Sequence, residues 1–242
     1  EQSFVLPTPS NKVLFPLGED DPELQRLKRN SSDEFYMERI MGIAAPPKGM
    51  VMTEFRPDIH IRVMPYDPAL PIYIWEDPGY GHAHAIEIAQ VHQGGHVHIH
   101  DEIFEQGIIT ESLIDDFCMH RFWWKNPQKK LVIDPNYANQ HPAQQSIAEL
   151  WLAKTGLVAA GTKISINDGT ERLKSFLKPN PITGQPRITF DPSCKGVLSE
   201  MGAYPNPFDG QTKVYSWEMD REGNVVGDKP RDRYNDGIKA VI

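Results

Sequence analysis

The sequence predicts an α/β fold in which helices flank a mixed central sheet, preceded by an N-terminal arm. Three observations support it. Strand-like segments follow one another closely over residues 71–103, strands and helices alternate after residue 110, and residues 1–65 are rich in proline and charge. Closely spaced strands pair antiparallel, whereas alternating strands and helices add parallel strands to a sheet. We therefore expect one sheet-containing domain in residues 66–242.

Residues 1–65 predict an arm or linker rather than an independent domain. They offer one helical segment, from Pro22 to about Met41, which the turn-forming stretch "GIAAPPKG" closes. One helix cannot bury a core of its own. Because the chain starts with Glu1 rather than Met and ends on "KAVI" within a predicted helix, we expect it to be part of a longer protein.

The predicted elements begin with three strands at 71–76, 83–93 and 96–103, joined by tight turns at "DPGYGH" and "QGG". Later strands are expected at "KKLVID", "GLVAAG" and "PRITFD", with a hairpin around "KVYSWEMDREGNVVGDK". The expected helices are "TESLIDDFCMHRFWWKN" with Thr110 as N-cap, Pro142 to Lys154, "NDGTERLKSFLKP", "DPSCKGVLSEMG" and "RDRYNDGIKAVI". The order βββ-α-β-α-β-α is that of an RNase H-like fold.

The composition excludes some classes of protein and leaves others open. No apolar stretch approaches the roughly 20 residues that a bilayer span needs. Cys118 and Cys194 lack the CxxC spacing of a zinc or redox site, and two cysteines are too few for a disulfide scaffold. The net charge of −8 argues against a generally basic nucleic-acid binder. A nuclease can have the same negative net charge, however, because its acidic residues hold metal cations.

Two predicted strands end on an Asp-Pro pair. "YIWED" ends in Asp77 and "KKLVID" ends in Asp134. If these strands lie side by side, the two carboxylates meet at one edge of the sheet, where they repel unless a cation neutralises them. Oxygen ligands suit Mg²⁺ or Mn²⁺. Taken alone, each Asp-Pro is equally well explained as the start of a turn.

A second acidic pair lies near the C-terminus. "RDRYNDGIKAVI" places Asp232 and Asp236 four residues apart, one turn apart on one face of the predicted helix. Like charges at this spacing destabilise an isolated helix, and a bound cation would explain them. A capping Asp232 and a solvated Asp236 are the simpler alternative. Two strand-end carboxylates and a helical one form the set that two-metal phosphodiester hydrolysis requires.

From about Phe35 onward the sequence resembles the nuclease domain of a tailed-phage large terminase, the DNA-packaging motor subunit, whose fold is RNase H/RuvC-like. The segments that carry the resemblance are "IYIWEDPGYGHAHAIEIAQV", "LVIDPNYANQ", "SINDGTERLKSFLKPNPITGQPRITFDPSCKGVLSEMGAY", "RDRYNDGIKA", and the connecting "DEFYMERIMG" and "GMVMTEFRPDIHI". Two positions depart from the family, which often has a small aliphatic residue in place of Glu76 and Asp-Ala in place of Asp236-Gly237.

The resemblance implies an endonuclease that cuts double-stranded DNA during viral genome packaging in the cytoplasm of the infected host cell. Asp77, Asp134 and Asp232 would bind two Mg²⁺ or Mn²⁺ ions, bridged by Asp77, with Asp236 as a fourth acid. Residues 1–65 would be the segment that connects the nuclease domain to an ATPase domain of the same full-length chain. The GxxxxGK[ST] motif of such an ATPase does not occur in this sequence. Small terminase and portal are the other implied partners, and no membrane is implied.

Two other functions compete with this one. "HQGGHVHIH" places His96, His98 and His100 on one face of a strand, which favours a zinc-dependent hydrolase. Three alternating residues span about 13 Å, however, so at most two of these rings reach one ion. An exposed strand face of polar rings is the plainer interpretation. A non-catalytic docking module of the packaging motor is the third class.

The chain also offers basic residues for contacts with phosphates, although each is equally well explained as a solvated surface charge. The candidates are Lys174, Lys178, Arg187, Lys213 and Arg221. We expect weak, salt-sensitive binding to duplex DNA, with the hairpin near 211–227 lying over the duplex. Glu102, at the end of the third strand, is a further candidate to face the same cleft as Asp77.

Overall fold

The computed structural model describes residues 7–30, 36–42, 49–134, 145–161 and 163–242. The chain forms two compact units, Glu1–Pro47 and Lys48–Ile242. The second unit begins well before residue 66, because Met50, Met52 and Phe55 are buried in its core. None of the helices in the described ranges is long and apolar enough to cross a bilayer.

The first unit is built of short helices. They are η1 (Thr8–Ser10), η2 (Gly18–Asp20), α1 (Pro22–Asn30) and the π-helical turn η3 (Tyr36–Ile40). α1 begins at the predicted Pro22 and ends at Asn30. The predicted continuation to Met41 passes through 31–35, which lie outside the described residues.

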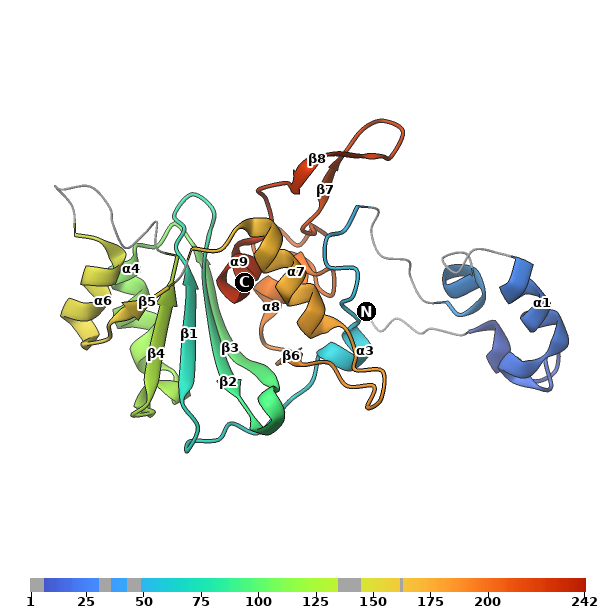
Figure 1. Cartoon of the computed structure of the whole chain (residues 1–242), viewed down its shortest axis with the longest axis horizontal. Helices are drawn as coiled ribbons and strands as arrows, with labels where there is room; N and C mark the ends of the chain where they lie inside the picture. Colours follow the sequence, from blue (N-terminus) through green and yellow to red (C-terminus); the bar gives the residue numbers. More distant parts are fainter. Residues whose placement is uncertain (1–6, 31–35, 43–48, 135–144, 162) are drawn as a thin grey trace. The chain divides into compact units, whose positions relative to one another are not determined.

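The second unit is organised around a six-stranded mixed sheet (Figure 1). Its strands are β1 (Ile72–Asp77), β2 (Ala83–Val91), β3 (Val97–Gln106), β4 (Lys129–Ile133), β5 (Ala159–Ala160) and β6 (Ile188–Phe190). The order is β5-β4-β1-β2-β3-β6, and β2 alone runs antiparallel to its neighbours. The predicted antiparallel pairing of the first three strands and the placement of β4 beside β1 are confirmed.

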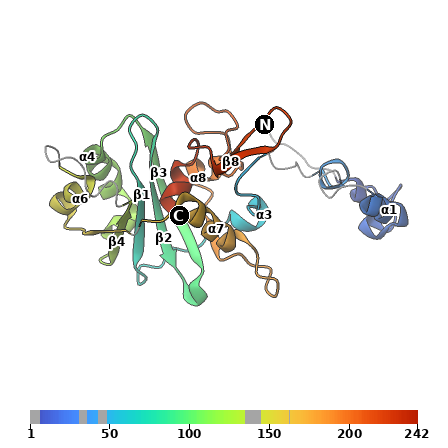
Figure 2. The ribbon, with the colours of Figure 1, turned by 45° about the horizontal axis from the view of Figure 1, so that its top comes forward.

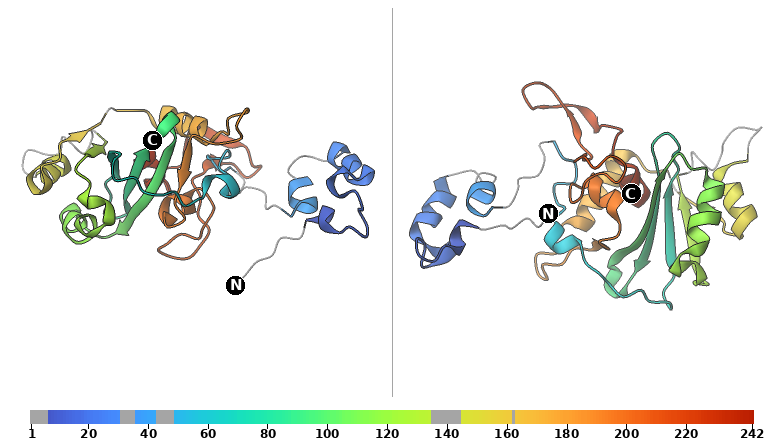
Figure 3. Two further views of the ribbon diagram at one scale, coloured as in Figure 1. Left: turned by 90° about the horizontal axis from the view of Figure 1, so that it is seen from below. Right: turned by 180° about the vertical axis from the view of Figure 1, so that it is seen from behind.

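Helices cover both faces of this sheet. One face carries α4 (Thr110–Ser112), η5 (Leu113–Phe117), η6 (Cys118–His120), η7 (Phe122–Lys125) and α6 (Ile147–Thr155). The other carries α7 (Ile166–Leu177), α8 (Lys195–Glu200) and α9 (Asp236–Val241). The remaining helical turns are α3 (Pro57–His60) and η4 (Gln93–Gly95). Figures 2 and 3 show α4 and α6 on one side of the strands and α7 and α8 on the other.

The predicted helix over residues 110–126 is broken in the structure. It divides into α4, η5, η6 and η7, and Thr110 is its first residue rather than its N-cap. Ile109 takes the cap position without a side-chain hydrogen bond. The break turns Trp123 inward, where it is fully buried and its indole N–H donates to Asp101 over 2.8 Å. This tertiary contact outweighs the local helical preference.

The final helix is shorter than predicted. α9 begins at Asp236, and Tyr234 just before it has a φ of 55°. A left-handed residue cannot continue a right-handed helix, so Asp232 lies in the preceding loop. The prediction that Asp232 and Asp236 share one helical face is therefore wrong.

Other boundaries moved for local reasons. α6 begins at Ile147, because Ser146 and Glu149 form a capping box there, and 142–144 of the predicted helix lie outside the described residues. Ser165 caps α7 by accepting the N–H of Asp168. The predicted hairpin is present as β7 (Trp217–Met219) and β8 (Val225–Pro230), a separate two-stranded sheet.

Candidate active site

Asp77 and Asp134 lie at the same edge of the sheet. Asp77 is the last residue of β1, and Asp134 directly follows β4. The two strands are parallel neighbours, with Glu76 opposite Ile133, so both chains leave the sheet at that edge. This is the juxtaposition that the Asp-Pro strand ends predicted.

Asp77 has an unusual environment for a carboxylate. It is 6% exposed, and its Oδ2 is buried without a hydrogen-bond partner. Burial is the main cause that raises the pKa of Asp77 to about 7. Lys239 and His82 oppose this rise, whereas the negative charges of Asp236 and Asp134 add to it. The carboxyl group is therefore crowded by two others, and one of its oxygens is directed at no protein donor.

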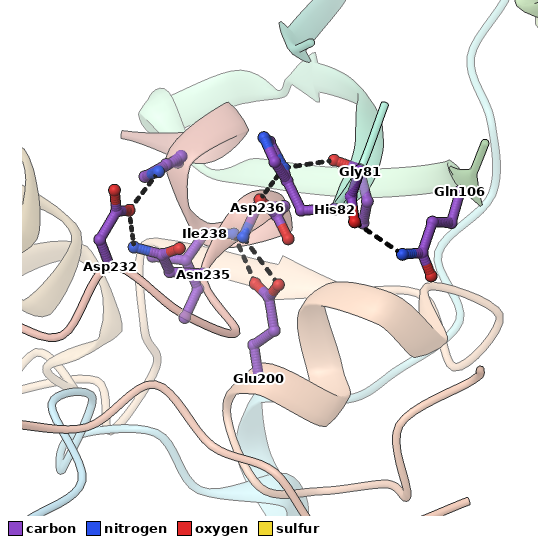
Figure 4. A network of polar contacts seen from close by, with 10 residues as sticks. Gly81, His82, Gln106, Glu200, Asp232, Asn235, Asp236 and Ile238 are labelled. Atoms are coloured by element: carbon purple, nitrogen blue, oxygen red, sulfur yellow. Dashed lines mark hydrogen bonds and ion pairs between the residues drawn. The ribbon is translucent and has the colours of Figure 1, made fainter. Parts of the chain in front are cut away.

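Asp236 is the acid that the C-terminal segment brings to Asp77. It is the first residue of α9, and its Oδ1 lies 2.7 Å from Nδ1 of His82 in the β1–β2 turn (Figure 4). Burial raises its pKa, and the nearby His82 and Lys239 oppose the rise. Gly79, in the same turn, leaves no room for a side chain, since a Cβ there would lie 2.2 Å from the Ala83 carbonyl oxygen.

Asp232 is placed differently. Its side chain is 82% exposed and forms an ion pair with Lys239, with Oδ1 at 2.6 Å from Nζ. The hydrogen bond from Lys239 is the largest cause that lowers the pKa of Asp232. Lys239, the partner of Asp232, is the charge that most opposes the raised pKa of Asp77. The structure thus gathers Asp77, Asp134 and Asp236, and connects Asp232 to them through Lys239.

A cleft of about 710 Å³ opens from Asp77 and Asp134 across the sheet. Asp77, Asp134 and Lys239 lie at its polar part, and the remaining lining is largely apolar. Its walls include Trp75, Val132, Leu173, Phe176 and Ile242, and Arg172 also lines it. A concave site with a few convergent polar groups is typical of a ligand or substrate site.

Two of the four predicted acids are paired with other side chains of the protein. In the described ranges, three or more His, Cys, Asp or Glu side chains do not converge to form a ready metal site. Instead, His82 pairs with Asp236, and Lys239 pairs with Asp232. The donor set nevertheless fits a hard divalent cation, because carboxylate oxygens are its preferred ligands and Asp77 Oδ2 is an unsatisfied buried acceptor.

Glu76, the acid beside Asp77, has a structural role. Successive strand residues point to opposite faces, so its side chain enters the core beneath α6. Its Oε1 lies 2.7 Å from Nε2 of His84, and its Oε2 accepts the indole N–H of Trp151 over 2.6 Å. The buried strand therefore ends on two carboxylates because one faces the cleft and the other fastens α6.

Glu102 does not face the cleft. Its two oxygens accept the backbone N–H groups of Gly196 and Val197, each over 2.6 Å, at the start of α8.

Burial, with the adjacent Glu102, raises the pKa of Glu87 on the neighbouring strand. Sequence-based prediction missed four residues around the site: Glu87, Glu200, His82 and Lys239. Of these, only Glu87 had a signal in the sequence, because a glutamate within a buried strand is unusual.

The histidine strand lies elsewhere in the fold. Nε2 of His96 and Nδ1 of His98 contact the same hydroxyl, that of Thr189, over 2.8 and 2.9 Å. Burial is the main cause that lowers the pKa of His98 to about 3 and that of His100 to about 4. Since Thr189 engages two of the three predicted rings, the structure gives no support to a zinc site there.

The basic residues predicted to contact DNA differ in availability. Lys174 pairs with Glu171, and Lys213 pairs with Asp209. The guanidinium of Arg187 lies 4.0 Å from the ring centre of Phe176 and donates to a serine hydroxyl. Lys178 and Arg221 are exposed. Arg231 and Arg233, which sequence-based prediction missed, are also exposed, beside Asp232, and form no salt bridge within the described part of the chain.

Comparison with solved structures identifies the fold. The large terminase of a thermophilic bacteriophage, in complex with ATP-gamma-S, matches with a TM-score of 0.58 and 17% identity, over 92% of this chain and 52% of that one. The P22 large terminase nuclease domain matches with 0.53 and 11% identity, over 78% and 87%. The large terminase nuclease from the thermophilic phage G20c matches with 0.50 and 14%, over 81% and 95%.

The second unit therefore has the RNase H-like fold of large terminase nuclease domains. The chain spans about half the length of the large terminase that was solved with ATP-gamma-S. No model of a known protein family and no curated protein matches the sequence.

Proposed function

We propose that this chain is a divalent-metal-dependent endonuclease that cuts double-stranded DNA during phage genome packaging. The observation that carries the proposal is the buried, unpartnered Oδ2 of Asp77, gathered with Asp134 and Asp236 at one sheet edge. The likeness to large terminase nuclease domains supports it, because their fold is shared over most of this chain.

Asp77, Asp134 and Asp236 are the residues that would hold Mg²⁺ or Mn²⁺. When bound, such ions activate a water molecule and stabilise the charge that develops on the phosphate and the leaving oxygen. Asp232 takes a different role from the one that the resemblance implied. Asp232 is exposed and paired with Lys239. We therefore propose that it holds the Lys239 side chain in position and does not bind the metal ion.

The chain's own residues prepare this site. The parallel β1 and β4 hold Asp77 and Asp134 on rigid strands, which are more exact supports than loops. Lys239 supplies positive charge beside Asp77 and Asp236, and Nδ1 of His82 lies 2.7 Å from Oδ1 of Asp236. Lys239 also lines the cleft, where its ammonium group would contact a phosphate of the substrate.

DNA would reach the site along exposed basic residues rather than along a large basic surface. The net charge of −8 opposes strong binding, so affinity depends on local contacts from residues such as Arg221, Arg231 and Arg233. Because the chain spans about half of a large terminase, we further propose that it works beside an ATPase domain of one longer protein. Small terminase and portal are proposed as the other partners.

The first test is incubation of the chain with supercoiled plasmid DNA in Mn²⁺, Mg²⁺ or EDTA. We expect nicked and linear products with either metal and none with EDTA. The products should carry 5′-phosphate and 3′-hydroxyl ends, because water attacks the phosphorus and the 3′ oxygen is the leaving group. Equal cutting in EDTA would contradict metal dependence, and intact plasmid under every condition would favour a docking module without catalytic activity.

A further inference from the structure

The first turn of α9 is held by a carboxyl group from another helix. Glu200, the last residue of α8, is 1% exposed. Its Oε1 accepts the backbone N–H of Asp236 over 2.8 Å, and its Oε2 accepts that of Ile238 over 2.9 Å (Figure 4). The N-cap residue Asn235 makes no capping hydrogen bond with its side chain. Glu200 therefore satisfies two of the N–H groups that a helix start leaves open.

This contact leaves α9 little freedom to move. A Cβ on Gly237 would lie 2.9 Å from Cβ of Val197 and 3.1 Å from Oε1 of Glu87, so the turn is packed closely against α8 and β2. Glu200 is itself fixed, since its carbonyl oxygen accepts the N–H of Tyr215 over 2.9 Å. The Glu200 side chain is therefore one of the contacts that set the position of the α9 start.

We propose that Glu200 is a positioning residue for Asp236. By binding the N–H of Asp236 itself, it fixes the backbone from which the third metal-site carboxylate extends toward His82 and Asp77. The inference rests on the proposed function, because the position of Asp236 matters for catalysis only if this acid holds a metal ion. Small displacements of a metal ligand weaken binding strongly, because the ligand geometry must be met closely.

The chain contains a matched control for this role. Glu102 binds two backbone N–H groups at the start of α8 in the same way as Glu200 does at the start of α9. The helix start that Glu102 holds carries no acid of the site. Loss of a carboxylate at a helix start is thus common to both variants, whereas direct loss of the hydrogen bond to the Asp236 N–H is specific to Glu200.

The experiment measures Mn²⁺ binding without DNA, by electron paramagnetic resonance of free Mn²⁺. The samples are the parent, Asp236→Asn, Glu200→Gln and Glu102→Gln, each checked for folding by near-UV circular dichroism. We expect Asp236→Asn and Glu200→Gln to weaken binding at least roughly tenfold, and Glu102→Gln to stay within about twofold of the parent. Plasmid cutting by Glu200→Gln should recover as Mn²⁺ is raised, because the ligand is displaced rather than removed.

Two results would overturn the positioning role while leaving the nuclease proposal intact. One is a folded Glu200→Gln that binds Mn²⁺ as the parent does, and the other is equal weakening by Glu102→Gln. If Glu200→Gln does not fold, Glu200→Asp, which keeps the charge on a shorter arm, is held to the same criterion. A parent that neither binds Mn²⁺ nor cuts DNA would instead refute the proposed function, and the positioning role with it.

Discussion

The indole nitrogen of Trp151 lies 2.6 Å from Oε2 of Glu76, and this contact fastens α6 to the end of β1 behind Asp77. Both side chains are buried. The other oxygen of Glu76 is engaged by His84, so the carboxyl group has a partner on each side. The end of β1 is thereby held from one face by α6, while its other face presents Asp77 to the cleft.

Trp151→Phe should destabilise the fold. It keeps most of the apolar ring but leaves Glu76 Oε2 buried without a donor, which costs about 1–3 kcal/mol, more for a charged group. The measurement is the free energy of unfolding from urea titration. Leu152→Ala, an exposed change on the same helix, serves as control and should stay within about 0.5 kcal/mol. Equal effects of the two changes would refute the anchoring role of the Trp151–Glu76 contact.

Asp236→Asn should impair plasmid cutting more than Asp232→Asn. Asp236 adds to the charge around Asp77, whereas Asp232 is exposed and paired with Lys239. We expect a loss on the order of 100-fold or more for the first, as when a two-metal site loses a ligand, and a loss below about tenfold for the second. The assignment of ligands is wrong if the order of these two effects is reversed.

The buried histidines should make the fold sensitive to acid. Burial is the main cause that lowers the pKa of His98 to about 3, and the charges of His100, His96, His92 and Arg62 add to this effect. Burial and the charge of His92 lower the pKa of His100 to about 4, and Asp191 opposes them. The unfolded chain therefore binds protons first, near the ordinary pKa of about 6.5. The stability that depends on neutral rings is complete above about pH 6.5 and is lost as pH falls toward about 4.

Other buried groups act in the opposite direction, since the pKa of Glu87 and that of Glu200 are raised. The test is therefore a difference between variants. Between about pH 7.5 and about pH 5, the urea midpoint of the parent should fall further than that of His98→Gln. His120→Gln, a change at an exposed histidine, should follow the parent. Parallel pH profiles for parent and His98→Gln would show that the ring carries no such penalty.

Arg231 and Arg233 should contribute to DNA binding more than Lys174 does. The two arginines are exposed beside the site, whereas Lys174 is paired with Glu171. Each alanine substitution of an arginine should lower the slope of log affinity against log salt concentration by about 1, if the residue contacts one phosphate. Fluorescence anisotropy with a labelled duplex measures this, and Lys174→Ala is the control. Unchanged slopes for both arginine variants would show that these residues do not contact DNA phosphates.

The sheet could be predicted from the sequence because its signals are local. The three closely spaced strand-like segments and the Asp-Pro ends at Asp77 and Asp134 predicted the strand pairing and the meeting of two acids. The third acid could not be assigned in this way. The choice of Asp236 over Asp232 depends on the positive φ of Tyr234, which no residue pattern in the segment indicates.

The remaining site features depend on contacts between residues far apart in the chain. Glu200 meets the start of α9 only because α8 and α9 pack together, and the break in the helix over 110–126 follows from burial of Trp123. Glu76 shows the same limit, since its role beside Asp77 is defined by Trp151. Periodicity and capping signals do not report such tertiary partners.

DNA cleavage should depend on Asp77 above every other acid of the site. Asp77→Asn keeps the shape of the side chain and removes its negative charge, and Asp58→Asn makes the same change at an exposed position in α3. The decisive measurement is the rate of plasmid nicking by parent, Asp77→Asn and Asp58→Asn in Mn²⁺. We expect no detectable nicking by folded Asp77→Asn and the parental rate for Asp58→Asn. Nicking by Asp77→Asn at the parental rate would contradict the proposed metal site.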